Sequence, residues 1–208
     1  SNPAYRPEFV SNDSKRGRRV LSVIEQELRE CQEFSISVAF ITLGGITPLL
    51  QTLKELEERG VKGRILTTDY LVFSDPKALD KLHELKNIEL KMFCAKEKED
   101  GFHTKGYIFR KEEMYRIIVG SSNMTAYALK MNREWNTKLV GYETGEVICD
   151  ILKEFDALWK EEHSLDYDAF IEDYRVRYEL IKKQKKIAKQ ELPVSLEQYR
   201  LEPNPMQT

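Results

Sequence analysis

The chain has 208 residues, 41% hydrophobic and 10% aromatic, which is enough for one domain with a sizeable core and a helical appendage. Its net charge of -2 conceals a charged fraction of 33%, so the overall charge does not indicate a nucleic-acid partner. Any such role must come from local clusters of charge.

The cysteines and the hydropathy pattern exclude several classes of protein. Cys31, Cys94 and Cys149 are odd in number and far apart, unlike the ligands of a zinc site or a secreted disulfide scaffold, which favours a reduced, cytoplasmic setting. No apolar run is long enough to span a bilayer, so we expect no membrane partner. Because the chain starts at Ser1 without Met and stops at Thr208, we expect a piece of a longer protein.

The N-terminal third predicts an extended arm over residues 1–13 and then a helix from Ser14 to about Glu30. The basic residues in the first turns of this helix oppose its dipole, and we interpret them as a solvated face in preference to a binding site. They are Lys15, Arg16, Arg18 and Arg19.

Strands and helices then alternate. A strand over 34–40 precedes an amphipathic helix over 46–59, which ends at Gly60, and a strand over 62–68 completes a parallel, right-handed crossover. Thr67 to Tyr70 follow the carboxyl end of this strand, where α/β proteins place loops that face a ligand. A helix from Ser74 to Leu85, with Pro76 near its start, leads to a strand over 88–93.

The second half predicts a hairpin, a last strand and two helices. Apolar runs over 102–109 and 114–119 form the hairpin, separated by the charged residues 110–113, and another strand covers 134–141. An amphipathic helix covers 145–159 and a longer one covers 167–190. The long helix is basic in its second half, and near a helix C-terminus a solvated face again outweighs nucleic-acid contact.

These elements predict an α/β fold, a mixed and mostly parallel sheet flanked by helices, with a C-terminal helical extension. We expect a catalytic domain over 14–163, the helical extension over 164–191 and a linker over 192–208, which contains three of the chain's prolines.

The residues from His103 to Glu134 combine the polar groups that a phosphodiester site needs. In a strand, His103 and Lys105 project to the same face, so an imidazole would stand beside a fixed cation that attracts phosphate. Gly120 to Asn123 supply a tight turn with backbone N–H groups, a hydroxyl and an amide. Glu134 could orient the imidazole and set its tautomer.

This order of residues resembles the active-site motif of the phospholipase D superfamily: His-x-Lys followed by Gly-Ser-x-Asn, at His103, Lys105, Gly120, Ser121 and Asn123. The resemblance covers residues 15–160 and depends on the motif more than on its flanks.

The spacing is most similar to the nuclease branch, which includes metal-independent restriction endonucleases. Asn123 lies twenty residues after His103, and Glu134 eleven after Asn123. The Asp that usually follows the Lys by five residues is replaced by Arg110, which weakens a lipase interpretation, whereas the restriction-type members use Glu instead.

The resemblance implies hydrolysis without a metal or another cofactor. His103 would be the nucleophile that forms a phosphohistidine, Lys105, Ser121 and Asn123 would bind the phosphate, and Glu134 would orient His103. A second histidine must protonate the leaving oxygen. Neither His83 nor His163 lies in a second motif, so the resemblance implies a homodimer with one His103 from each protomer.

The tail adds a weaker resemblance. Leu201 to Thr208 look like the entry to a helicase motor, which would make the chain the N-terminal nuclease-like domain of a DNA helicase.

The leading hypothesis is therefore a nuclease module acting on DNA. The alternative is a module that binds the DNA backbone without cleaving it, because Arg110 replaces the Asp. A third hypothesis is phosphoryl transfer on a lipid or a small phosphodiester, and a fourth is an α/β interaction domain with a coincidental motif.

Overall fold

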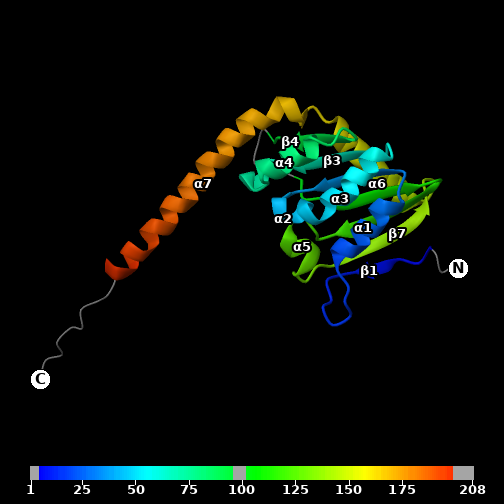
Figure 1. Ribbon diagram of the computed structural model, residues 1–208, viewed down its shortest axis with the longest axis horizontal. Helices are drawn as coiled ribbons and strands as arrows, with labels where there is room; N and C mark the ends of the chain where they lie inside the picture. The colour runs from blue at the N-terminus through cyan, green and yellow to red at the C-terminus, as the bar shows by residue number, and fades with distance from the viewer. Residues whose placement is uncertain (1–4, 96–101, 199–208) are drawn as a thin grey trace, which may run out of the picture.

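The computed structural model describes residues 5–95 and 102–198, with side chains as far as residue 189. Its described strands form a single mixed sheet in the order β1-β7-β6-β5-β2-β3-β4-β8, with helices on both faces (Figure 1). The strands are β1 (Glu8–Val10), β2 (Glu33–Val38), β3 (Lys62–Thr68), β4 (Ile88–Phe93), β5 (Lys105–Lys111), β6 (Met114–Gly120), β7 (Asn136–Tyr142) and β8 (Ser164–Asp166).

Helices connect these strands and lie on both faces of the sheet. They are α1 (Val20–Glu30), α2 (Leu43–Ile46), the 3-10 turn η2 (Thr47–Leu49), α3 (Leu50–Glu58), the 3-10 turn η3 (Tyr70–Val72), α4 (Pro76–His83), α5 (Ala126–Lys130), α6 (Glu146–Lys160) and α7 (Tyr167–Gln198). The predicted helix over 46–59 is broken into η2 and α3, because Pro48 near its start lacks the N–H that a regular helix requires. Gly60 ends α3 in the left-handed conformation, with φ +70°, as predicted.

The α/β class and the mixed sheet are confirmed, but the expectation of a mostly parallel sheet is wrong. Only β2 with β3 and β3 with β4 pair in parallel, and the other five pairings of the described strands are antiparallel. The reason is the length of the connections: the hairpin from β5 to β6 and the short α5 segment before β7 reverse the chain directly.

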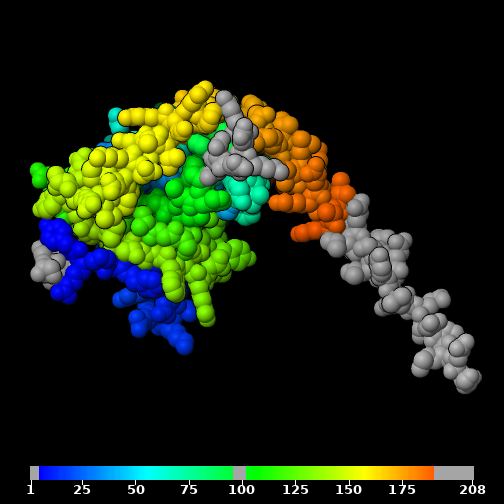
Figure 2. Space-filling model, turned by 180° about the vertical axis from the view of Figure 1, so that it is seen from behind, coloured from blue at the N-terminus to red at the C-terminus, as the bar shows by residue number. Residues whose placement is uncertain are grey.

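Two apolar cores lie on the two faces of the sheet. Helices α1, α3 and α4 and the start of α7 cover one face, whereas α6 covers part of the other face. Figure 2, seen from behind, shows α6 in yellow with the green atoms of the hairpin exposed beside it. None of the described helices combines the length and the apolar character that crossing a membrane requires.

The first helix begins later than predicted. Ser14 does not cap it, because the Asp13 side chain accepts the N–H groups of Lys15 and Arg16 and closes a tight turn instead. The helix starts at Val20, whose N–H donates to Asn12 Oδ1 at 2.9 Å, so the cap comes from eight residues upstream. The basic residues before Val20 therefore lie mainly in the turn and not on a helix face.

The C-terminal division of the chain also differs from the prediction. The boundary at residue 163 is not a domain boundary, because β8 pairs with β4 and Phe170 and Tyr174 of α7 enter the main core. Residues 192–198, which were expected to be part of a linker, are helical, since α7 continues through Pro193 to Gln198. One proline removes one helical hydrogen bond, which the Glu, Gln and Lys residues around it, all good helix formers, can offset. The predicted charged loop over 96–101 and the helicase-like tail over 201–208 lie outside the described residues.

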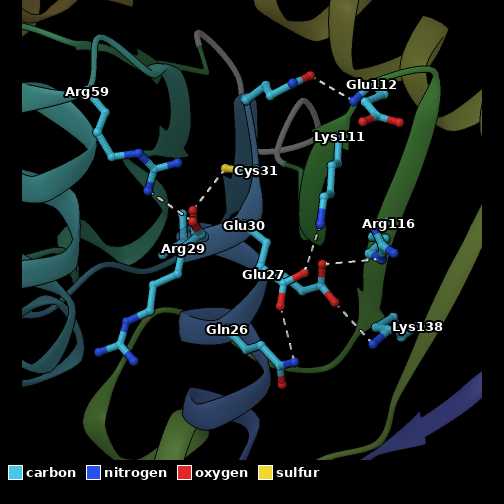
Figure 3. A network of polar contacts seen from close by, with 12 residues as sticks. Gln26, Glu27, Arg29, Glu30, Cys31, Arg59, Lys111, Glu112, Arg116 and Lys138 are labelled. Atoms are coloured by element: carbon cyan, nitrogen blue, oxygen red, sulfur yellow. Dashed lines mark hydrogen bonds and ion pairs between the residues drawn. The ribbon is translucent and has the colours of Figure 1, made fainter.

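A buried carboxylate joins α1 to the antiparallel half of the sheet (Figure 3). Glu27 has 5% exposure and lies 3.1 Å from Lys138 on β7 and 3.7 Å from Arg116 on β6. Burial alone would lower the pKa of Lys138, but the hydrogen bond and the negative charge of Glu27 outweigh it, so the pKa is raised. The ammonium is therefore fully charged at neutral pH.

We expect Glu27→Ala to lower the free energy of unfolding by ~3 kcal/mol, because Arg116 would lose its carboxylate partner and Lys138 would keep only the exposed Glu8. Glu30→Ala is the matched control on the same helix, since its ion pair with Lys111 is half exposed and should contribute less than about 1 kcal/mol. Urea unfolding of both variants measures the difference. Equal losses of unfolding free energy in the two variants would mean that burial does not strengthen the ion pairs of Glu27.

Candidate active site

The predicted site residues meet at one edge of the sheet. The start of β5 lies beside the end of β2, with Lys105 paired to Val38, because the two strands are antiparallel. The end of β6 lies beside the start of β7, with Gly120 paired to Asn136. Residues that are distant in the sequence are thereby brought to a single edge by the register of the strands.

His103 precedes β5, so the argument from strand alternation does not apply to it. The strand begins at Lys105, whose ammonium donates to the backbone carbonyl of His103 at 2.8 Å. The imidazole is exposed and lies edge-on to the ring of Tyr70, with 4.5 Å between the centroids. The ammonium of Lys105 therefore lies against the backbone of His103, and its predicted place beside the imidazole stays a prediction.

His103 and Lys105 line a pocket of about 420 Å³ between the sheet edge and α6. The α6 wall is apolar at Ile151, Phe155 and Leu158, and it carries two exposed carboxylates, Asp150 and Glu154, which the sequence analysis did not single out. An anion is thus attracted to the Lys105 side of the pocket and repelled from the α6 side. This asymmetry favours the Lys105 side of the pocket for any anion.

Asn123 is held in one orientation by the backbone of the loop after β2. The N–H of Phe40 donates to Asn123 Oδ1 at 3.0 Å, and because a backbone N–H can only donate, it identifies which end of the amide is the oxygen. The Nδ2 group makes no hydrogen bond with the described residues. Both N–H donors of the Asn123 amide are therefore without a partner among the described residues.

Glu134 is buried and holds Ser121. The Ser121 hydroxyl donates to Glu134 Oε2 and accepts from the N–H of Trp135 at 3.1 Å. No hydrogen bond joins Glu134 to His103 in the described part of the chain. The predicted orienting role of Glu134 toward His103 is therefore not displayed in this conformation, and it stays a prediction.

Gly120 is required by the close approach of β6 and β7. A Cβ at this position would overlap the carbonyl of Trp135 and the backbone of Asn136. Steric exclusion thus explains the glycine of the motif. Only a residue without a side chain lets the turn that carries Ser121 lie against β7.

A buried set of hydrogen bonds lies beneath the turn, and the sequence analysis missed it. Asn136 Nδ2 donates to Ser122 Oγ at 2.9 Å and to the Val10 carbonyl at 3.1 Å, and the Tyr107 hydroxyl donates to the Ser122 carbonyl at 3.0 Å. Burial, with a further contribution from the charge of Glu134, raises the pKa of Tyr107 strongly, so its hydroxyl stays protonated. In the sequence, Ser122 and Asn136 could have been found as polar residues at positions that the apolar pattern assigns to the interior.

Gly45 was also missed, although it fixes the loop that carries Asn123. A Cβ on Gly45 would overlap the carbonyl of Met124. Met124 in turn donates its N–H to the Phe40 carbonyl and accepts from the N–H of Thr42, both at 3.1 Å. The segment that follows β2 therefore holds Met124, the neighbour of Asn123, through both its N–H and its carbonyl group.

Of the loop after β3, Tyr70 contacts a predicted site residue. Thr67 is buried and donates its hydroxyl to the Ala39 carbonyl at 3.2 Å, and Asp69 pairs with Arg177 of α7 at 3.0 Å. The ring of Tyr70 brings this loop to His103, and the expectation that the loop faces a ligand stays a prediction.

Arg110, which replaces the usual Asp, lies at the opposite end of β5. It pairs with Glu33 at the start of β2, with 3.2 Å between Arg110 Nη2 and Glu33 Oε2. The replacement therefore does not change the pocket around His103.

The remaining histidines lie elsewhere. The ring of His83 stacks on Tyr167 at 3.7 Å, and His163 faces Phe93. His103 is the histidine among the three that lines the pocket. The other two histidines therefore lie away from this pocket.

Cysteine is not an alternative nucleophile at this edge. Cys94 follows β4, and burial, reinforced by the charge of Asp69, raises the pKa of its thiol to about 12. The thiol is therefore protonated at neutral pH. Among the residues that the structure describes, no cluster of three or more His, Cys, Asp or Glu side chains could hold a metal ion.

Comparison with known proteins identifies the family. The family model described as "Cardiolipin synthase, PLD-like domain" matches residues 24–159. The chain belongs to the PLD-like domain family. None of the curated proteins compared with this PLD-like chain matches it.

Solved structures share the PLD-like fold. NucT from Helicobacter pylori is similar with a TM-score of 0.59 at 15% identity, over 78% of this chain and 99% of that one. Nuc from Salmonella typhimurium, a phospholipase D family member, has a TM-score of 0.57 at 16% identity, again over 78% and 99%. The yeast tyrosyl-DNA phosphodiesterase has a TM-score of 0.50 at 14% identity, over 74% of this chain and 39% of that one. At these identities the likeness concerns the fold, and the family includes phosphodiesterases and nucleases.

Proposed function

We propose that this PLD-like domain is a nuclease that cleaves DNA phosphodiesters without a metal, through a covalent phosphohistidine. The observation that carries the proposal is a pocket lined by His103 and Lys105 at the edge of the sheet where β2 ends, with the amide of Asn123 held by the loop after the same strand. A nucleophile, a cation and neutral donors around one phosphate are what in-line attack at phosphorus requires.

In the proposed mechanism a neutral His103 nitrogen attacks phosphorus and forms a P–N bond. The bond to the leaving oxygen breaks, and that oxygen takes a proton from a second imidazole. Lys105 and Asn123 hold the non-bridging oxygens while negative charge builds up on them. Water then attacks phosphorus, loses its proton to the second imidazole and releases His103.

We propose that the second imidazole is His103 of a second copy of this chain, facing the first across a two-fold axis. The surface beside the site supports an interface: Trp135 is 77% exposed next to Glu134, and it meets the ring of Phe9, which is 61% exposed. Exposed aromatic pairs of this size are typical of surfaces that become buried on association.

DNA as the substrate is part of the proposal, and the printed name of tyrosyl-DNA phosphodiesterase among the similar folds supports it. The placement of this domain before a helicase motor and its cytoplasmic location remain proposals as well. They rest on the resemblance of residues 201–208 and on the spacing of the cysteines.

A second candidate function is a module that grips the DNA backbone without cleaving it. The observation that favours it is the engagement of the Ser121 hydroxyl with Glu134, which removes one donor from the phosphate cradle and leaves His103 without a carboxylate partner. Salt-dependent DNA binding without turnover would select this alternative.

The test is nicking of supercoiled plasmid in EDTA by the wild-type chain and by His103→Ala. We expect nicking by the wild type and none by the variant, since the nucleophile is lost. Nicking that survives the substitution, or that appears only when a divalent metal is added, contradicts the proposal. Circular dichroism of His103→Ala serves as the control for folding, because the exposed imidazole contributes little to the core.

A further inference from the structure

A second cavity lies where α7 leaves the body of the domain. One side of it is α7, which follows the residues that the family model matches, and the other side belongs to the matched part of the chain. It is a groove of about 540 Å³ between the second half of α7 and the segment from Val72 to Asp75. Its α7 side carries four lysines, which face Asp75 as the one acidic residue in the lining. They are Lys182, Lys185, Lys186 and Lys189.

The spacing of these lysines puts them on one face of the helix. They recur at intervals of three and four residues, and from the first to the last they span roughly 10 Å of helix axis at a rise of 1.5 Å per residue. Lys183 falls on another face and does not line the groove. In the structure, this basic face of α7 lines a groove, whereas the sequence suggested a solvated helix face.

The groove is joined to the active site by aromatic rings. Phe73, in the groove lining, lies 4.7 Å from Phe40, which stacks on Tyr70 with 6.2 Å between centroids and 21° between planes. Tyr70 contacts His103 at 4.5 Å. Phe73 and Tyr70 are 46% and 38% exposed, so both rings present a face to solvent between the lysines and the imidazole.

The segment that carries these rings is strained and firmly anchored. Leu71 and Val72 have φ of +55° and +49°, a region that a β-branched residue rarely adopts. Arg177 of α7 pairs with Asp69 at 3.0 Å and Tyr174 donates to the Ser74 carbonyl at 2.7 Å, one on each side of the strained residues. Helix α7 is therefore fixed relative to Tyr70 and His103, and its lysines have a defined position with respect to the site.

We propose that this groove binds a single-stranded segment of DNA and leads it to His103. Phosphates would contact the α7 lysines while bases stack on Phe73 and Tyr70, a combination that suits single strands because a duplex keeps its bases internal. The inference rests on the proposed function, since it names the form of DNA that the same site receives.

The experiment measures binding in the His103→Ala background, so that cleavage does not consume the probe. The probe is a fluorescent thymidine oligomer of about twelve nucleotides, within the range that single-strand sites cover. The groove variant carries Lys→Gln at positions 182, 185, 186 and 189. The matched control carries Lys→Gln at four exposed lysines outside the groove, at positions 54, 62, 86 and 183, with the same change in net charge.

The groove variant should bind the oligomer roughly tenfold or more weakly, and the slope of log Kd against log salt should fall by about two to three. The control should bind like the parent. Phe73→Leu should weaken binding by about tenfold, and Phe73→Tyr should restore it, because the stacking face is what matters. Equal loss in the control, or no loss in the groove variant, overturns the inference.

Two further arms separate the alternatives. A blunt duplex of equal length that binds as tightly as the oligomer, with Phe73→Leu unaffected, overturns the single-strand assignment. Binding of phosphatidylserine vesicles through the same lysines, without binding of the oligomer, assigns the groove to lipid instead. If the wild type fails to nick plasmid while the groove variant still loses oligomer binding, the nuclease proposal fails and the groove inference stands.

Discussion

Dimers that combine one wild-type protomer with one His103→Ala protomer are expected to cleave DNA on the order of 10³-fold more slowly than wild-type dimers. The proposed mechanism uses two imidazoles, one to attack phosphorus and one to protonate the leaving oxygen. The described protomer brings one histidine to the pocket, since His83 and His163 face Tyr167 and Phe93. A mixed dimer therefore lacks either the nucleophile or the acid at every composite site.

The measurement uses protomers with two different affinity tags, co-expressed and purified through both tags in succession. Single-turnover cleavage in EDTA then reports on the mixed species, and doubly tagged wild-type dimers are the control for the tags. If the mixed dimer keeps about half of the wild-type activity, each protomer works alone and the shared site is wrong. If the chain is monomeric at the working concentration and still cleaves, the same conclusion follows.

Asn123→Asp is expected to lower cleavage by about 10²- to 10³-fold, the cost of losing one preorganised donor to the transition state. The substitution is nearly isosteric, and the N–H of Phe40 can still donate to the carboxylate oxygen that replaces Oδ1. The loop should therefore keep its position. What changes is the other end of the side chain, where a negative oxygen replaces an amide that donates to phosphate.

Asn132→Asp is the matched control, because it adds the same charge at an exposed position in the nearby loop before β7. Rates at saturating and limiting DNA separate weaker binding from slower chemistry. An Asn123→Asp variant that cleaves as fast as Asn132→Asp would mean that the amide does not face the phosphate. Thermal unfolding of both variants shows whether the loop has kept its packing.

The sequence predicted best those elements whose stability is local. Strands β3 and β4 have the predicted bounds, because each is a continuous or alternating apolar run between clear breaks. The hairpin and the turn after it were predicted from the same kind of signal, although β5 begins at Lys105 and leaves His103 outside the strand. The edge strands β1 and β8 were missed because three residues carry too little pattern.

The contacts that were missed are those made across the fold. Asn12 caps α1 from eight residues upstream, and Gly45 packs against a backbone carbonyl some eighty residues later in the chain. The sequence indicated Glu134 as a site carboxylate, but only the register of β6 and β7 shows that it meets the Ser121 hydroxyl. Periodicity cannot predict such pairs, because it describes which face a residue occupies and not what lies opposite.

The hydrogen bonds beneath the turn have a consequence for the energetics of substrate binding. Ser122 is fully buried, and its backbone and side chain are held by Asn136 and Tyr107, so the turn loses its conformational entropy when the protein folds. That entropy is not lost a second time when a phosphate arrives. More of the favourable energy of the phosphate contacts is then left to stabilise the bound state, and the backbone amides of this turn should be among the slowest to exchange with deuterium.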